Sequence, residues 1–74
     1  MTYSCVLINV DNGKIIPVLE RIRKIEGVID VFACFGRFDI VVILQANDIS
    51  ELAMLTAEIN SIEGVEKTET LVAS

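Results

Sequence analysis

The sequence predicts an α+β fold built from two βαβ halves in the order strand, helix, strand, strand, helix, strand. Apolar residues change along the chain from short runs typical of strands to spacings of three and four typical of helices. The tetrapeptide Ile-Glu-Gly-Val at residues 25–28 returns at residues 62–65, 37 positions later, where a second helix is expected to end. Two such halves form a ferredoxin-like, antiparallel four-stranded sheet with two helices on one face, as in dimeric α/β barrels.

The first half begins with a strand expected over residues 3–10, rich in β-branched residues and ended by Asp-Asn-Gly. A helix follows over residues 14–25, where apolar residues recur at helical spacing between charged ones. Pro17 lacks a backbone N–H and is tolerated only in a first turn, so we expect the helix to start at residues 13–16. Gly27 supplies the left-handed residue that ends it.

A hairpin is expected next, with strands over residues 28–35 and 40–44 joined by a tight turn at residues 36–39. The second strand is continuously apolar. In the first, strict alternation gives two faces. One face is expected to carry Val28, Asp30, Phe32 and Cys34.

The second half closes with another helix and a last strand. Asp48 followed three positions later by Glu51 resembles a capping box and marks the helix start. Gly64 is expected to end this helix, and residues 65–72 form the last strand. The apolar stripe of the helix consists of Leu52, Leu55, Ile59 and Ile62.

Composition excludes several classes of function. The net charge of −5 argues against nucleic-acid binding, which needs a basic face. The chain has no histidine, so neither a histidine-based triad nor a histidine zinc site is available. No C-x-x-C motif or glycine-rich phosphate loop is present, and the carboxylates are expected on solvated faces. We therefore expect no catalytic residue, metal site or cofactor.

The two cysteines, Cys5 and Cys34, are too few for a disulfide scaffold and are expected to be buried free thiols. No apolar run approaches the roughly 18 residues of a membrane span. The N-terminus lacks the basic region of a signal peptide. These features predict one soluble, cytoplasmic domain over residues 1–74.

A sheet with helices on one face leaves its other face uncovered. The chain is 53% apolar and has a mean hydropathy of +0.60. This is more apolar side-chain material than a core of this size needs. We expect a second copy of the chain to cover the open face. An isolated monomer should be poorly soluble or unfolded.

The turn at residues 36–39 stands out as a candidate site. Gly36, Arg37, Phe38 and Asp39 combine backbone N–H groups with a fixed negative charge. The N–H groups could meet the carboxylate of a zwitterion while Asp39 meets its ammonium. Alternatively, Gly36 only permits the turn, Phe38 caps the core and Asp39 bonds its own backbone.

Two longer motifs favour the ligand-binding interpretation of this turn over the purely structural one. They are Gly-Val-x-x-Val-x-x-x-Phe-Gly-Arg-Phe-Asp-Ile-Val-Val at residues 27–42 and Ile-Glu-Gly-Val-x-x-Thr-x-Thr-Leu-Val at residues 62–72. Together they resemble the C-terminal effector domain of the Lrp/AsnC transcription regulators, also called the RAM domain, over residues 3–72. The resemblance implies a βαββαβ fold, homodimers formed through the open sheet faces, and octameric or decameric rings. It also implies amino-acid effectors held between neighbouring dimers.

The resemblance also implies which residues bind the effector. Gly36, Arg37, Phe38 and Asp39 match the effector loop of the family, and Asp39 is assigned to the ammonium of the ligand. Thr68 and Thr70 match the Thr-x-Thr of the last strand, where hydroxyls contact the ligand or hold the loop; Thr70 is equally compatible with a plain strand threonine.

The family's N-terminal helix-turn-helix has no counterpart in this sequence, so we expect a stand-alone RAM protein that does not bind DNA directly. The leading hypothesis is an amino-acid sensor in transcription or metabolic regulation. One alternative is an assembly partner that joins full-length Lrp/AsnC regulators without binding a ligand. An acylphosphatase-like enzyme of the same fold is disfavoured, because no loop brings together the arginine and asparagine it needs.

Overall fold

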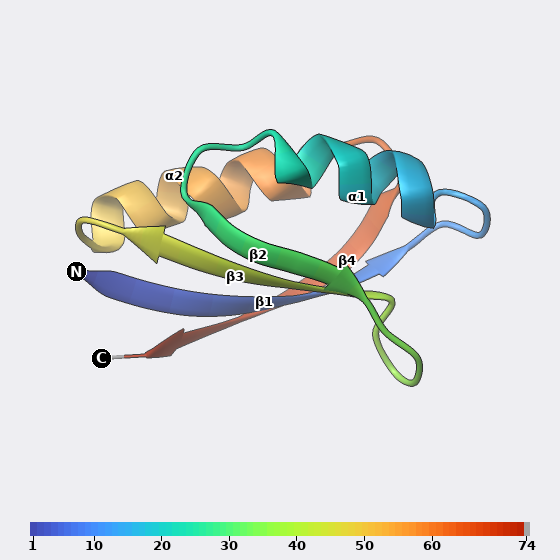
Figure 1. Cartoon of the computed structure of the whole chain (residues 1–74), viewed down its shortest axis with the longest axis horizontal. Helices are drawn as coiled ribbons and strands as arrows, with labels where there is room; N and C mark the ends of the chain where they lie inside the picture. Colours follow the sequence, from blue (N-terminus) through green and yellow to red (C-terminus); the bar gives the residue numbers. More distant parts are fainter. Residues whose placement is uncertain (74) are drawn as a thin grey trace.

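The computed structural model describes residues 1–73, and its elements follow the predicted order. Figure 1 shows both helices on one side of a single twisted sheet. The elements are β1 (Thr2–Val10), α1 (Ile15–Arg23), β2 (Val28–Ala33), β3 (Ile40–Ala46), α2 (Ile49–Asn60) and β4 (Val65–Ala73).

The strands lie in the order β2-β3-β1-β4, and every neighbouring pair is antiparallel. Each half of the chain therefore contributes one inner strand and one outer strand. This is the predicted ferredoxin-like topology. The expectation of an α+β fold with a bare sheet face is confirmed.

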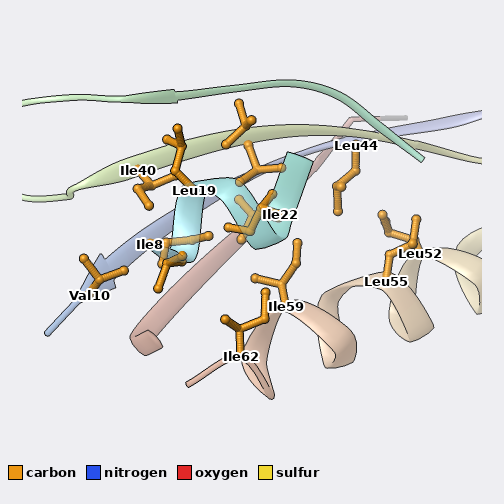
Figure 2. Close-up of a cluster of buried hydrophobic side chains, with 14 of the residues drawn as sticks. Ile8, Val10, Leu19, Ile22, Ile40, Leu44, Leu52, Leu55, Ile59 and Ile62 are labelled. Atoms are coloured by element: carbon orange, nitrogen blue, oxygen red, sulfur yellow. The ribbon is translucent and has the colours of Figure 1, made fainter. Parts of the chain in front are cut away.

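The core lies between the sheet and the helices, and it is formed by alternate residues of the two inner strands. In β1 and β3 every second side chain is buried, which is the period-two pattern of a strand with one covered face. The helices meet this surface with apolar stripes, as Figure 2 shows for Ile22 of α1 and for Leu52 and Ile59 of α2. The strand residues that are less than 2% exposed are Val6, Ile8, Ile40, Val42 and Leu44.

The helix starts follow local chemistry. Pro17 is the third residue of α1, inside the first turn, where its missing N–H has no helical partner. In α2 the Asp48 carboxylate accepts a hydrogen bond from the Glu51 backbone N–H at 2.8 Å, as the predicted cap requires. The Glu51 side chain reaches one residue further back than in a standard capping box. It accepts hydrogen bonds from the backbone N–H and side-chain amide of Asn47 at 3.3 and 3.2 Å.

Gly27 and Gly64 lie four residues after the last residues of α1 and α2, at equivalent points of the internal repeat, so neither ends its helix directly as predicted. Both have left-handed backbone, with φ of +104° and +103°. Each turn also packs tightly against the helix of the other half. A Cβ on Gly27 would lie 2.9 Å from a Leu55 methyl carbon, and one on Gly64 would lie 3.1 Å from Val18 Cγ2. The repeat is therefore structural, and its glycines are required by both backbone conformation and packing.

Several predicted boundaries are wrong by a few residues. Helix α1 ends at Arg23 rather than residue 25, because the Lys24 and Ile25 N–H groups bond to carbonyls three residues back. Strand β2 stops at Ala33, so the connecting loop begins at Cys34. Strand β3 continues to Ala46, two residues beyond the expected end.

The predicted face of β2 is also wrong at one position. The register between β2 and β3 shifts at an irregularity between Val28 and Asp30. Val28 consequently pairs with Leu44 on the helix side, whereas Asp30 pairs with Ile43 on the open side. Simple alternation cannot anticipate this shift, since an extra residue exchanges the two faces.

The open face of the sheet carries a broad apolar surface, termed the open sheet face here. Tyr3, Phe32 and Leu71 are about half exposed, at 46%, 46% and 51%. The strand register places the half-buried residues Cys5, Leu7, Val41 and Ile43 among them. Cys5 and Cys34 are both free, as predicted, but they are half-buried rather than buried. Cys5 loses its expected cover because it points away from the helices.

Candidate ligand-binding site

The loop at residues 34–39 joins the two halves and is tied at its base to the sheet. The Cys34 N–H donates to the Asp39 carbonyl at 2.9 Å, and the Cys34 thiol donates to the Phe38 carbonyl at 3.2 Å. Gly36 has φ of +119°, yet a Cβ there would meet nothing within 4 Å. Phe35 is fully exposed. The tip of the loop thus projects into solvent from a fixed base.

The Asp39 carboxylate connects this loop to the central strand β1. Its Oδ2 atom accepts a hydrogen bond from the Val10 backbone N–H at 2.9 Å. Its own backbone N–H donates to the Ile8 carbonyl at 2.8 Å. Within residues 1–73, Oδ2 is the one carboxylate oxygen of Asp39 in a hydrogen bond. The side chain is therefore held in one orientation, bound to a neighbouring strand rather than to its own turn, with Oδ1 available to a further donor.

A pocket of about 430 Å³ lies between this loop and the start of α1. Its walls combine apolar side chains with one carboxylate. The lining residues are Ile15, Ala33, Cys34, Phe35, Gly36 and Asp39. Of the four predicted loop residues, Gly36 and Asp39 line this pocket, whereas the exposed Arg37 and half-buried Phe38 lie outside its lining. Four lining residues were not among the predicted site residues: Ile15, Ala33, Cys34 and Phe35. The apolar run around Cys34 was the signal for the last three, whereas Ile15 belongs to the apolar pattern of the first helix.

The two predicted threonines lie on β4, away from the pocket in the same chain. Thr68 pairs with Ile8 and faces the helices, where its hydroxyl and the Asn60 side-chain oxygen are 2.7 Å apart. Thr70 pairs with Val6 and is exposed. One inner strand, β1, separates Thr68 from the base of the loop. A single chain thus does not bring the threonines and the loop into one cavity.

Acidic side chains gather at the same end of the sheet. The register between β1 and β4 shifts after Asn9, which leaves Glu66 without a partner residue in β1. The pKa of Glu66 is raised above its ordinary value because its protonated form hydrogen-bonds to Asp11. The negative charge of Asp11, slight desolvation and the charge of Asp39 raise this pKa further. Asp11 and Glu66 thus add negative potential close to Asp39, a clustering that the strand pattern alone did not reveal.

Metal-binding clusters and membrane-spanning helices are both absent from the part of the chain that the structure describes. Residues 1–73 hold no group of three or more histidine, cysteine or acidic side chains placed to bind a metal ion. No helix in this range combines the length and apolar character that crossing a bilayer requires.

Comparison with known proteins identifies the domain. The family described as the Lrp/AsnC ligand binding domain matches residues 4–74. The chain belongs to this family. The resemblance inferred from the two motifs is therefore confirmed. The family is a ligand-binding domain of transcription regulators and not a class of enzyme, in agreement with the sequence prediction.

Similar proteins place this Lrp/AsnC domain in context. It is 33% identical over 67 residues to the HTH-type transcriptional regulator FL11 of Pyrococcus furiosus, a match covering 90% of this chain and 44% of that protein. The chain thus spans less than half the length of this curated relative. The crystal structure of TTHA0845 from Thermus thermophilus superposes with a TM-score of 0.95 at 33% identity, covering all of this chain and 94% of that one.

A more distant structure shares the fold. The transcriptional regulator NMB0573 of Neisseria meningitidis, solved as a complex with L-Met, matches with a TM-score of 0.86 at 14% identity. The match covers 99% of this chain and 49% of that one.

Proposed function

We propose that this Lrp/AsnC domain binds a free amino acid at the pocket beside the loop at residues 34–39. The observation that carries the proposal is the geometry of Asp39. Its carboxylate is anchored through Oδ2 to the Val10 N–H and keeps Oδ1 available at the wall of a cavity of about 430 Å³. That volume falls within the range of about 300–1,000 Å³ found for small-molecule sites.

The charges around the pocket favour an ammonium group. Asp39 supplies a fixed carboxylate, and Asp11 and Glu66 add negative potential behind it. A charge-assisted hydrogen bond from an α-ammonium to Oδ1 is stronger than a neutral one. Since the Val10 N–H already orients the side chain, binding costs little further conformational entropy.

The carboxylate of the ligand requires donors, and the loop can supply them. No hydrogen bond within residues 1–73 uses the backbone N–H groups of residues 35–38. Arg37 is exposed and takes part in no ion pair in the described range. In this proposal Gly36, Arg37 and Phe38 present N–H groups and a guanidinium to the carboxylate. The apolar walls formed by Ile15, Ala33 and Phe35 hold the side chain of the ligand.

The threonines enter the proposal through a neighbouring subunit. The Thr68 hydroxyl is already hydrogen-bonded to the Asn60 side chain, whereas Thr70 is exposed and its hydroxyl forms no hydrogen bond within residues 1–73. Thr70 of an adjacent copy is therefore the better placed of the two to reach a ligand, while Thr68 holds the end of α2 against β4. This division agrees with a site that is completed between subunits.

The open sheet face supports a homodimer. Phe32, Tyr3 and Leu71 remain about half exposed around a strip of half-buried apolar side chains. Each Å² of apolar surface removed from water contributes about 25 cal/mol. Covering this face with a second copy is the simplest way to recover that free energy. A ligand that contacts two dimers then stabilises the larger octameric or decameric ring by mass action.

A second candidate function follows from the extent of the match. The chain corresponds to 44% of the curated relative, so the domain alone could co-assemble with longer Lrp/AsnC regulators and act through them without a ligand. This assembly-partner function requires the open sheet face but not Asp39. The two functions therefore differ in their dependence on one carboxylate.

Isothermal titration calorimetry against the twenty amino acids tests the proposal, beginning with methionine because NMB0573 was solved with that ligand. The decisive variant is Asp39→Asn, whose amide oxygen can still accept from the Val10 N–H while the charge is lost. We expect binding to weaken by about tenfold or more, with the oligomer unchanged.

Glu20→Gln is the matched control, since it removes a carboxylate from the exposed face of α1 and should bind like the parent. Heat from none of the amino acids, with the assembly intact, would exclude the sensor function and leave the assembly partner.

A further inference from the structure

The internal repeat creates two equivalent grooves on the helix layer, one beside each glycine turn. The larger groove, of about 570 Å³, lies between the turn at residues 24–27 and one face of α2. It is termed the acidic groove here. Its charged residues are three glutamates and one lysine. They are Glu26, Glu51, Glu58 and Lys24, around the apolar side chains of Ile25, Met54 and Leu55.

The smaller groove, of about 190 Å³, lies between the second turn and α1 and is termed the basic groove. It is lined by Lys14, Pro17, Arg21, Ile62 and Glu63. The two copies of the repeat are 37 positions apart, so each residue that α1 and its N-cap contribute to the basic groove has an equivalent in the acidic groove. Lys14 corresponds to Glu51, Pro17 to Met54 and Arg21 to Glu58.

The two grooves therefore have the same architecture and opposite charge. In the basic groove, Lys14 Nζ lies 3.7 Å from Glu63 Oε2, the one ion pair within residues 1–73. The equivalent positions in the acidic groove, Glu51 and Glu26, carry like charges. Glu51 is bonded to Asn47, but Glu26 and Glu58 have no cationic partner among the described residues. Within residues 1–73 the acidic groove thus lacks the ion pair that its counterpart has.

We propose that the acidic groove receives the basic edge of α1, centred on Arg21, from a second copy of this chain. Arg21 is exposed and forms no ion pair within residues 1–73, so its charge is available. The basic groove includes Lys14, next to the start of α1, and the acidic groove includes Glu51, in the first turn of α2. Figure 1 shows the starts of the two helices at opposite ends of the helix layer. Within residues 1–73 no ion pair joins the two grooves, so the proposal places their complementary charges in contact between copies.

An apolar contact accompanies the charges. Met54 is 73% exposed and lies between Glu51 and Glu58 on the same face of α2, because residues three and four apart are neighbours on a helix. An unbranched thioether of this kind adapts to a partner surface. The acidic groove consequently offers an apolar centre with a charged rim, which is the usual anatomy of an interface.

The contact joins two different surfaces, so it is heterologous. In a pair of copies joined in this way, one copy still has a free acidic groove and the other still has a free basic edge of α1. Further copies can add at both ends, which gives a closed ring or a filament. The inference goes beyond the proposed function because it uses neither the Asp39 pocket nor the open sheet face. It supplies a second, charge-dependent interface on the opposite side of the molecule.

Charge reversal tests this interface directly. Glu58→Arg and Arg21→Glu should each place like charges in contact and weaken the higher assembly by about tenfold or more, as measured by sedimentation velocity at low salt. The double variant E58R/R21E should restore assembly, and so should an equimolar mixture of the two single variants. High salt should weaken the parent assembly.

Two matched controls carry the same charge changes elsewhere on α1. Glu20→Arg and Arg23→Glu alter exposed residues that line neither groove and should assemble like the parent. Circular dichroism melting should show that all variants are folded.

The inference is overturned if the parent shows no assembly beyond a dimer, if the controls weaken assembly equally, or if the double variant stays dissociated. Rescue by the charge swap would support this interface whatever Asp39→Asn does, because Asp39 lines neither groove. Loss of amino-acid binding in Asp39→Asn bears on the ligand proposal alone.

Discussion

The two helix-ending turns and the loop between the halves all contain glycine with positive φ, but for different reasons. At Gly27 and Gly64 the backbone passes so close to the opposite helix that an added Cβ would lie only 2.9 Å and 3.1 Å from its side chains. At Gly36 the surrounding space is open. Gly27 and Gly64 permit close packing of the turns against the helices, whereas Gly36 permits a turn whose backbone is exposed to solvent. The comparison separates the part of the molecule that holds the fold from the part that is free to meet a ligand.

The largest expected effect comes from Gly27→Ala. The new Cβ would lie 2.9 Å from Leu55 Cδ1 and 3.3 Å from the Gln45 carbonyl oxygen, in addition to the strain of φ at +104°. We expect the free energy of unfolding to fall by about 3 kcal/mol. Urea denaturation at fixed protein concentration measures it. Gly64→Ala, with Cβ contacts at 3.1 Å, should lower the free energy of unfolding nearly as much. If either variant lost less stability than Gly36→Ala, the contrast between the two kinds of glycine would be wrong.

Gly36→Ala should cost less stability but affect binding. Its φ of +119° strains an alanine by about 1 kcal/mol, with no steric clash to add. Gly13→Ala is the matched control, because Gly13 also has positive φ and open space around it but lies outside the pocket. Both variants should lose similar stability, and only Gly36→Ala should weaken amino-acid binding by calorimetry. Equal binding by both would remove the loop from the site.

The smallest effect concerns the acidic end of the sheet. The raised pKa of Glu66 means that the folded state binds its proton more tightly than the unfolded state does. Its contribution to stability is therefore present below the ordinary glutamate pKa and is lost as pH rises through the folded value. Glu66→Gln should raise the melting temperature slightly at about pH 7, with the difference vanishing near about pH 4. A variant that is less stable at neutral pH would contradict the assigned repulsion.

Much of the fold follows from the sequence because it depends on local periodicity. The alternating burial of β1 and β3, the Asp48 cap and the position of Pro17 all reflect interactions within a few residues. What the sequence does not predict depends on pairing between strands. The irregularity at Val28 moved one side chain to the other face, and the register shift after Asn9 brought Glu66 to Asp11.

The candidate site was also predicted only in part: its loop was located, but the contacts of that loop with distant elements were not. The loop and Asp39 were located by residue type, since glycine beside a carboxylate marks a turn with exposed backbone. The partners of these groups came from elsewhere in the chain. The bond from Val10 to Asp39, the wall formed by Ile15 and the bond between Thr68 and Asn60 each join elements that are distant in sequence. Their ligand-binding roles stay predictions until binding is measured.

The strand order has a consequence for how the two halves depend on each other. Because β2-β3-β1-β4 alternates the halves across the sheet, each half donates an inner strand to a core that it cannot complete alone. The loop at residues 34–39 is their sole covalent link. Cutting the backbone there would yield two fragments, each poorly folded in isolation, that recombine through strand pairing. The segment proposed to sense a ligand is thus also the point at which the chain divides into its two structural halves.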